Sequence, residues 1–445
     1  MESLVDGGLE RVQAALREAT VGADGHPDLT FLLQSLDGGP ASELFIDAAG
    51  EDASSRRSQI YRAASMTKAV TSACILLLAE EGKLGVNAPV SRYIPEFEHL
   101  EVAVIADESP EIEYCPITTR PLPILTMTVK HLLNHTSGLL YCFSDMLSVR
   151  ADVDPLKAKL YKHVCDCYRR EGVFDLPTDA SHTSDALIAA LAKCPLVNAP
   201  GAGFHYGLGT DVLGVIVERL TGGTLEAFAT ARIFAPLGME DTSWLVPAAK
   251  LPRLATLREN VKGDLVPVDT SAGSALSDAA RLNFAYHPLC SYTTPGTHQS
   301  GGGGMCTTID DYVKFIRSVL AALLGRTSDL ELPRILSQYS ARLMCTDSLT
   351  SIDVKSRDLV KEGWGYGLGF AVLTSPSTAG EFGPPGLCRW AGIFGTEFWI
   401  DPTNEIIGVM MSQRYPWDFF DVRTYYRALV YGALKDSCLV KYVKY

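Results

Sequence analysis

Short apolar segments near both ends of the chain predict strands, and longer segments with helical spacing lie between them. Residues 28–38 and 42–50 are two such short segments, joined by a Gly/Pro turn, which is typical of paired strands. Four more are expected at 363–374, 386–392, 396–404 and 405–413. A closing helix is predicted over 419–435, so strands gather at the two termini of the chain.

Helical spacing of apolar residues marks the start and the middle of the chain. Leu9, Val12 and Leu16 fit one face of an N-terminal helix. A second helix is expected over 65–81, where Gly82 gives a stop signal. Helices are also expected within 128–139, 185–194 and 210–222, and a glycine-rich loop at 300–304 leads into another that runs to 325.

This order of elements predicts an α+β fold. A sheet built from both ends of the chain, with helices between them, indicates a sheet domain interrupted by an insertion. We expect the sheet domain at 1–88 and 300–445, and a mostly helical inserted domain at 89–299. The sheet is expected to be antiparallel and flanked by helices.

Composition and charge narrow the class of protein. The chain has 445 residues, of which 47% are hydrophobic and 20% charged, and its net charge of -13 disfavours nucleic acid and anionic membrane surfaces as partners. The longest apolar runs, such as 73–79, are too short to span a membrane, and no secretory signal is visible. The 11 cysteines are scattered without a framework, which indicates free thiols in a reducing compartment. We therefore expect a cytoplasmic protein, with no metal site and no cofactor.

The strongest chemical signal is the tetrapeptide Ser65-Met66-Thr67-Lys68 at the start of the second helix. Residues three apart on a helix share a face, so the lysine amine can reach the serine hydroxyl. A serine needs such a base to become a nucleophile, and burial favours the neutral amine that can accept its proton. Alone the motif is weak, because a helix start with a solvated lysine gives the same four letters.

The context makes it specific, because the chain resembles the serine β-lactamase and penicillin-binding superfamily from about residue 55 to 440. Besides RAASMTK, three further segments match in the expected order: LLNHTSGL, PGAGFHYGLGTDVLGVIVERLTG and CRWAGIFGTEFWIDP. The most similar branch is the class C β-lactamase-like esterases and transesterases. The resemblance implies a β-lactamase/transpeptidase-like fold, with Ser65 as nucleophile and Lys68 and Tyr206 as proton-transfer partners. It also implies an oxyanion hole made by the backbone amides of Ser65 and Ile393, an assignment that rests on alignment alone.

Two departures from the lactam-processing members change the expected substrate. Those members carry Lys-Thr-Gly in the third motif, where this chain has Trp390-Ala391-Gly392. A tryptophan cannot pair with a carboxylate but offers a broad apolar surface. Arg389 is adjacent, and strand alternation predicts that it points to the opposite face. Leu208 replaces an asparagine that holds the substrate amide in class C lactamases, so an uncharged, apolar acyl group is expected.

Among these relatives the chain looks most like the fungal lovastatin-type acyltransferases. That resemblance implies substrate contacts for Arg62, Tyr141 and Trp417, although Arg62 is equally compatible with a structural ion pair. The remaining wall of the pocket is expected from residues of the same motifs, which are Phe143, Trp390, Gly392 and Phe394. Each of these aromatic residues is also compatible with an ordinary place in the core.

The function expected from these motifs is acyl transfer through a serine acyl-enzyme. The donor would be an ester or a thioester, carrier-protein-linked and CoA-linked thioesters included, and the acceptor an alcohol of secondary metabolism. A hydrolase that uses water on the same acyl-enzyme stays open, as does a catalytically silent ligand-binding protein on this fold. Rival motifs are absent or incomplete: no G-x-S-x-G occurs, HLLNH lacks the glutamate of a zinc protease, and SGGGG lacks the Lys-Ser/Thr of a P-loop.

Overall fold

The structure is a computed structural model of the chain. It describes the residues at 12, 14–15, 29–37, 43–47, 56–105, 111–116, 126–144, 154–174, 180–261, 264–268, 297–328, 330, 332–415 and 422–434.

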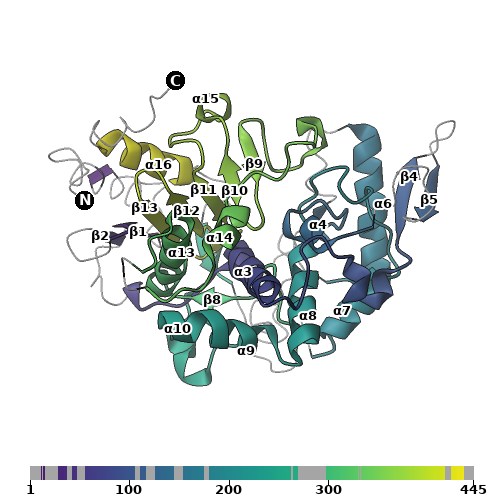
Figure 1. Cartoon of the computed structure of the whole chain (residues 1–445), viewed down its shortest axis with the longest axis horizontal. Coiled ribbons are helices and arrows are strands. Elements are labelled where there is room, and N and C mark those ends of the chain that lie inside the picture. Colours follow the sequence, from purple (N-terminus) through teal and green to yellow (C-terminus); the bar gives the residue numbers. More distant parts are fainter. Residues whose placement is uncertain are drawn as a thin grey trace.

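A seven-stranded antiparallel sheet forms one half of the described protein (Figure 1). Its order is β2-β1-β13-β12-β11-β10-β9, so the N-terminal hairpin joins the C-terminal strands through the β1–β13 pair. The strands are β1 (Thr30–Ser35), β2 (Glu43–Asp47), β9 (Trp364–Tyr366), β10 (Ala371–Leu373), β11 (Cys388–Ala391), β12 (Glu397–Asp401) and β13 (Ile406–Met411).

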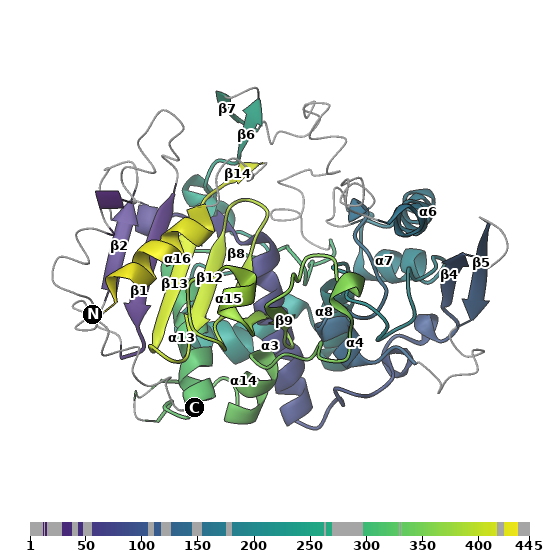
Figure 2. The same cartoon turned by 90° about the horizontal axis from the view of Figure 1, so that it is seen from above.

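Each face of the sheet has its own apolar core, because successive side chains point to opposite faces. On β12, Phe398 packs against Tyr312 of α13 (Ile309–Leu324). The next residue, Trp399, packs edge-on against Tyr426 of α16 (Val422–Ala433). Figure 2 shows α16 lying across the strands. The sheet is thus sandwiched between α16 and the rest of the protein.

One glycine is required by this packing. Gly408 of β13 pairs in register with Trp399, and a Cβ at Gly408 would lie 2.2 Å from the indole ring. No side chain fits at that distance, so a glycine in the middle of the strand allows the tryptophan to lie flat over it.

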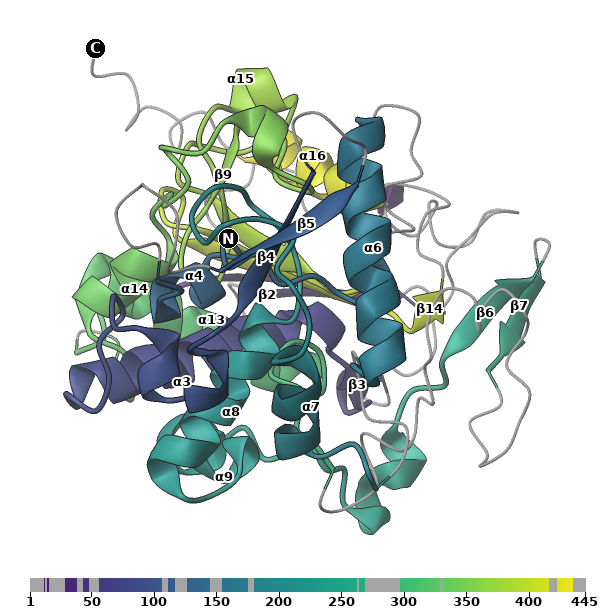
Figure 3. The ribbon, with the colours of Figure 1, turned by 90° about the vertical axis from the view of Figure 1, so that its right-hand side faces the viewer.

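The second half of the described protein is mainly helical, with α3 (Thr67–Glu80) between it and the sheet (Figure 1). Helix α3 packs on α8 (Gly209–Thr221) and α9 (Leu225–Ala229), and α4 (Val129–Leu133) packs on α8. Figure 3 shows α6 (Pro155–Glu171) beside the hairpin of β4 (Glu101–Ile105) and β5 (Ile112–Pro116), which it contacts through β4.

Shorter elements connect these parts. The strands are β3 (Tyr61–Arg62), which pairs with β8 (Cys306–Thr307), and β6 (Arg258–Val261), which pairs with β7 (Asp264–Pro267) and β14 (Arg414–Tyr415). The helical segments are η2 (Ala64–Met66), η3 (Val90–Arg92), η4 (Pro95–Phe97), α7 (Ser184–Leu191), η5 (Thr230–Phe234), α10 (Ala235–Leu237), η6 (Ala248–Arg253), α14 (Gln338–Met344), η7 (Val354–Ser356) and α15 (Pro376–Ala379).

The predicted α+β fold, with an antiparallel sheet flanked by helices, is confirmed. The segment 363–374 differs from expectation: it forms two strands, β9 and β10, since the glycines between them allow a tight reversal. The β4–β5 hairpin and α6 lie in the part expected to be mostly helical and were not predicted individually. The domain division at 88/89 and 299/300 stays a prediction, and most of the expected N-terminal helix lies outside the described residues.

Candidate active site

Ser65 lies in the tight turn that joins strand β3 to helix α3. The turn is the 3-10 segment η2, and its first residue, Ala64, has a positive φ of 47°, which is unfavourable for a residue with a Cβ. Thr67 stabilises it by donating its hydroxyl to the Ala64 carbonyl over 2.6 Å. Ala64 and Met66 are buried while Ser65 is partly exposed, so the turn directs the serine outward.

Lys68, one turn along, is 1% exposed and has three acceptors for its three N–H groups. Nζ lies 3.3 Å from Ser65 Oγ, 2.7 Å from the Tyr141 hydroxyl and 2.6 Å from the Gly302 carbonyl oxygen. A buried ammonium is costly unless it is bonded in this way. The predicted contact between the serine and the lysine is therefore present, and Tyr141 and Gly302 hold the amine in place.

The three partners of Lys68 differ in what they can do. The Gly302 carbonyl can only accept, so it always takes one N–H of the amine. Ser65 and Tyr141 are hydroxyls, which can either accept from the amine or donate to it. A neutral Lys68 would thus keep its bond to Gly302 and turn its lone pair toward a hydroxyl, which is the arrangement that a general base requires.

Tyr141 comes from the segment after α4 and is held there by helix α6. The Cys165 thiol contacts the Tyr141 carbonyl at 3.5 Å, and the Leu140 N–H donates to the Tyr168 hydroxyl over 3.3 Å. The Tyr141 ring stacks on Phe143 with 5.1 Å between centroids and 9° between planes. The structure thus places the two aromatic residues expected in the pocket wall side by side, and brings the hydroxyl of one of them to Lys68.

Tyr206 precedes helix α8 and faces Lys68 with its ring. Lys68 Nζ lies 4.6 Å from the ring centroid, so the cation expected beside this tyrosine is present. The Tyr206 hydroxyl accepts a hydrogen bond from the indole N–H of Trp390 over 3.2 Å. Tyr141, rather than Tyr206, therefore makes the direct hydroxyl contact with the lysine in this structure.

The end of β11 approaches the serine turn closely. A Cβ on Gly392 would lie 2.7 Å from the Ala63 carbonyl oxygen and 3.0 Å from the Ala64 Cβ, so only glycine fits there. Neither Ser65 nor Ile393 donates its N–H to any acceptor among the described residues, and both residues are partly exposed. Two unpaired N–H groups at this junction fit the expected oxyanion hole.

The other residues predicted for the site are buried in the core or lie outside the described residues. Arg62 is 2% exposed and donates to the Ala255 carbonyl oxygen and to Gln413 Oε1, at 2.8 and 3.3 Å. Phe394 is buried against Ala64 in the core behind the serine turn. Leu208 is fully buried in the main core. Trp417 lies outside the described residues.

Arg389 points away from the site, as strand alternation predicts. Its guanidinium pairs with Glu397 at 3.0 Å and lies 5.2 Å from the ring centroid of Trp364. Burial and the nearby positive charge of Arg427 lower its pKa to about 10. Trp390, the next residue, faces Tyr206 instead, so the described residues show no cation on β11 beside the catalytic candidates.

Two residues that lie against the site were not expected there from the sequence. One is Gly302, whose carbonyl oxygen accepts from Lys68; the SGGGG run resembles a glycine-rich loop common near the active-site rim of this family, but no role for one backbone carbonyl followed from that resemblance. The other is His135, whose ring lies 4.7 Å from that of Tyr206. Burial, then the positive charge of Lys68, hold the pKa of His135 well below its usual value, so it adds no second charge beside the lysine.

Comparison with known proteins identifies the family. A family model described as Beta-lactamase matches residues 43–432 of this chain. The chain belongs to the β-lactamase family. This confirms the predicted superfamily and its fold.

The related proteins are bacterial and fungal. Protein Rv1367c of Mycobacterium tuberculosis is 32% identical over 367 residues, covering 81% of this chain and 79% of its own. Esterase EstB of Burkholderia gladioli is 29% identical and covers 78% of this chain and 75% of its own. Lovastatin esterase of Penicillium rubens is 27% identical and covers 81% of each. The names of the two esterases support a serine hydrolase or acyltransferase.

Solved structures agree on the fold. EstCE1, described as a hydrolase with promiscuous acyltransferase activity, has a TM-score of 0.71 at 24% identity and covers 96% of this chain and 99% of its own. Unliganded simvastatin synthase (LovD) from Aspergillus terreus has a TM-score of 0.67 at 20% identity, with coverages of 98% and 99%. Both structures share the fold of this chain, and the expected likeness to lovastatin-type proteins is confirmed by the 27% sequence identity to lovastatin esterase.

The described residues contain neither a membrane-spanning helix nor a metal-binding cluster. None of the described helices has the length and apolar character needed to cross a membrane. No three His, Cys, Asp or Glu side chains in the described part of the chain gather in a way that could hold a metal ion.

Proposed function

We propose that this enzyme forms an acyl-enzyme on Ser65 and transfers an apolar acyl group from an ester or thioester to an alcohol. The observation that carries the proposal is the 3.3 Å distance from Lys68 Nζ to Ser65 Oγ, with the amine held by Gly302 and Tyr141. A nucleophile with its base within hydrogen-bond reach, and the base oriented by further groups, is the arrangement that covalent acyl transfer requires.

The first half-reaction makes the acyl-enzyme. Lys68 accepts the proton of the Ser65 hydroxyl as Oγ bonds to the carbonyl carbon of the donor. The carbonyl oxygen becomes an oxyanion, which the N–H groups of Ser65 and Ile393 stabilise. The bond to the leaving alcohol or thiol then breaks, and Tyr206 relays a proton to the leaving group.

The second half-reaction runs the same steps with a new nucleophile. An alcohol gives its proton to the Tyr206–Lys68 pair as its oxygen bonds to the acyl carbon. The bond to Ser65 Oγ breaks, Oγ regains a proton, and the product ester leaves. No cofactor is needed for either half, since only bonds at the acyl carbon and protons are exchanged.

An uncharged acyl group is supported by the walls around Ser65. Trp390, Tyr206, Tyr141 and Phe143 bring aromatic surface together on one side of Lys68. Such surfaces favour apolar ligands with a few placed polar contacts. Arg389, the nearest cation on the same strand, is engaged with Glu397 on the other face.

The biological setting is part of the same proposal. An acceptor alcohol from secondary metabolism is supported by the fungal relative named lovastatin esterase, and the proposed donor is a carrier-protein-linked or CoA-linked thioester. A cytoplasmic location is supported by the nine described cysteines, each of which is a free thiol.

The fate of the acyl-enzyme distinguishes the proposed transferase from the alternative, a hydrolase. Ser65 would be loaded from a short acyl thioester and followed by intact mass, with and without a panel of small alcohols. The proposal predicts an acyl adduct that persists in water and is discharged when an alcohol is added, with the new ester appearing in equal amount. Rapid discharge in water alone, unchanged by alcohols, would instead establish hydrolysis.

A further inference from the structure

A buried carboxylate lies behind Gly302, one of the three residues that bind the Lys68 amine. Asp211, in the first turn of α8, is fully buried. Its Oδ1 accepts hydrogen bonds from the Ser300 hydroxyl at 2.5 Å and from the Gly302 N–H at 3.1 Å. His298 Nε2 lies 3.7 Å from the same oxygen. The other oxygen, Oδ2, has no hydrogen-bond partner among the described residues.

Among the described residues, Gly302 connects Asp211 to the lysine. The Gly302 N–H is bound by Asp211, while its carbonyl accepts from Lys68 at 2.6 Å. A Cβ on Gly302 would lie 2.4 Å from Asp211 Oδ2 and 2.7 Å from the Tyr141 hydroxyl. Any side chain at this position would therefore displace the carboxylate, the tyrosine or the loop.

The same loop is fastened to both neighbouring helices. Thr71 of α3 donates its hydroxyl to the Gly301 carbonyl over 2.9 Å, and a Cβ on Gly301 would lie 2.4 Å from the carbonyl oxygen of Thr210 on α8. The glycine-rich run at 300–304 is thus pressed between α3 and α8, with the Asp211 carboxylate as its polar anchor. Hydrogen bonds to a carboxylate are about twice as strong as neutral ones, which makes this anchor stiff.

We propose that Asp211 is a positioning residue for acyl transfer: by binding Ser300 and Gly302, it fixes the Gly302 carbonyl that holds the Lys68 amine toward Ser65. This inference rests on the proposed function. A buried carboxylate with one unbonded oxygen is expensive for stability alone. Its use here is to hold a backbone carbonyl in one place, so that the amine keeps its reach to the serine.

The test compares three replacements by the kinetics of labelling with a fluorophosphonate probe. Asp211→Leu has a similar shape but removes both acceptors, whereas Asp211→Asn keeps one oxygen for Ser300 and Gly302. We expect Asp211→Leu to lower the maximal labelling rate by roughly 30-fold or more, because the base is misplaced, with the half-saturating probe concentration changed less than about twofold. Asp211→Asn should restore the rate to within about fivefold of wild type. Ser300→Ala, a milder change in case Asp211→Leu does not fold, should lower the rate by about three- to tenfold.

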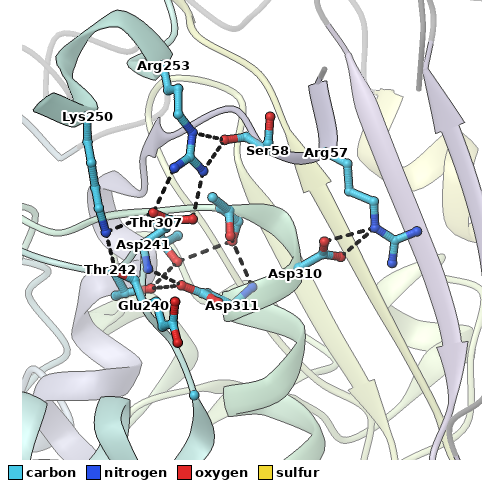
Figure 4. A network of polar contacts seen from close by, with 12 residues as sticks. Arg57, Ser58, Glu240, Asp241, Thr242, Lys250, Arg253, Thr307, Asp310 and Asp311 are labelled. Atoms are coloured by element: carbon cyan, nitrogen blue, oxygen red, sulfur yellow. Dashed lines mark hydrogen bonds and ion pairs between the residues drawn. The ribbon is translucent and has the colours of Figure 1, made fainter. Parts of the chain in front are cut away.

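Asp311 provides a matched control away from the site. Figure 4 shows this second buried aspartate, which accepts from the Asp241 N–H at 2.8 Å and the Thr242 hydroxyl at 3.1 Å. Among the described residues, no group that binds Asp311 is in contact with Lys68. Asp311→Leu should lower the stability against urea as Asp211→Leu does, and leave the labelling rate of the folded protein at the wild-type value.

The outcomes separate this inference from the function on which it rests. If folded wild type is labelled at Ser65, and Asp211→Leu and Ser300→Ala are labelled at the same maximal rate, the positioning role is wrong and the proposed function stands. Loss of rate in Asp311→Leu equal to that in Asp211→Leu would also overturn it. A wild type that is not labelled at Ser65 overturns the proposed function and this inference together.

Discussion

The indole N–H of Trp390 donates a hydrogen bond to the Tyr206 hydroxyl over 3.2 Å. In the lactam-processing members of the family, the resemblance places a substrate-binding lysine where this tryptophan stands. The replacement therefore does more than remove a charge, because it ties the pocket wall to a residue expected to move protons. The bond leaves the hydroxyl proton of Tyr206 available for a substrate or for Ser65.

Trp390→Phe should distinguish the contribution of the aromatic surface from that of the hydrogen bond to Tyr206. Phenylalanine keeps an aromatic surface but lacks the N–H. We expect kcat for a short p-nitrophenyl ester to fall about fivefold, the value of one ordinary hydrogen bond, with KM changed less than twofold. Steady-state kinetics give both constants. A raised KM with unchanged kcat would show that Trp390 only binds substrate.

The two tyrosines around Lys68 should contribute unequally. Tyr206→Phe removes the proposed relay and should lower kcat by about 10²- to 10³-fold. Tyr141→Phe removes one of three partners of the amine and should cost about tenfold. Both variants keep the aromatic ring, so a change in KM would show an effect on the pocket wall independently of proton transfer. A greater loss in Tyr141→Phe than in Tyr206→Phe would assign the relay to the tyrosine that touches Lys68.

The fold and the contact between Ser65 and Lys68 could be predicted because they depend on local patterns. The tetrapeptide from Ser65 to Lys68 needs only one helical turn to bring its ends together, and the structure shows that contact. The strands of the sheet were expected from short apolar runs with turn residues between them. The superfamily followed from four motifs in order, which no single motif would have established.

The parts that were missed depend on tertiary contacts without a side-chain signature. A backbone carbonyl such as that of Gly302 has no side-chain signature in a sequence, and the close packing of the glycine run is evident only in the fold. Asp211 is one acidic residue within the helix predicted over 210–222, and only the fold shows that it is fully buried. The placement of the Tyr141 hydroxyl on Lys68 likewise needs the approach of α6.

Acid should destabilise the protein through His131. Burial, then the charge of Lys130, lower the pKa of His131 to about 4. The unfolded chain takes up this proton near pH 6.5, so stability is fully present above that pH and is lost as the pH falls toward 4, by up to about 3 kcal/mol for this residue.

The His131→Gln variant is the matched control for this pH effect. His131 completes a capping box by accepting from the Thr128 N–H at 3.2 Å, and glutamine can make the same bond without titrating. Urea unfolding at pH 7.5, 6 and 5 should show a smaller loss of stability in His131→Gln than in wild type. Equal losses in the two proteins would contradict the assignment.

A buried ion-pair network should anchor the closing helix to the sheet. Arg427 of α16 pairs with Glu397 of β12 at 2.5 Å and with Glu381 at 2.9 Å, and both Arg427 and Glu397 are almost fully buried. Arg427→Met should destabilise the protein by about 3–5 kcal/mol, because it leaves Glu397 short of a partner in the interior. Adding Glu397→Gln should recover part of that loss.

Two comparisons check the interpretation of Arg427→Met. The exposed pair of Lys162 and Asp166 is a control, since Lys162→Met should change the unfolding free energy by less than about 1 kcal/mol. Activity per folded molecule should survive in Arg427→Met, because α16 covers the sheet face opposite to the site. Loss of activity without loss of stability would contradict this division of roles.

The central claim is that Ser65 is an activated nucleophile, and intact mass after fluorophosphonate treatment tests it most directly. A bond forms between Ser65 Oγ and phosphorus, fluoride leaves, and Lys68 accepts the serine proton. We predict one probe mass on folded wild type, none on Ser65→Ala, and much slower addition to Lys68→Met. A folded wild type without added mass, or equal labelling of Ser65→Ala, would contradict the account and favour a catalytically silent binding protein on this fold.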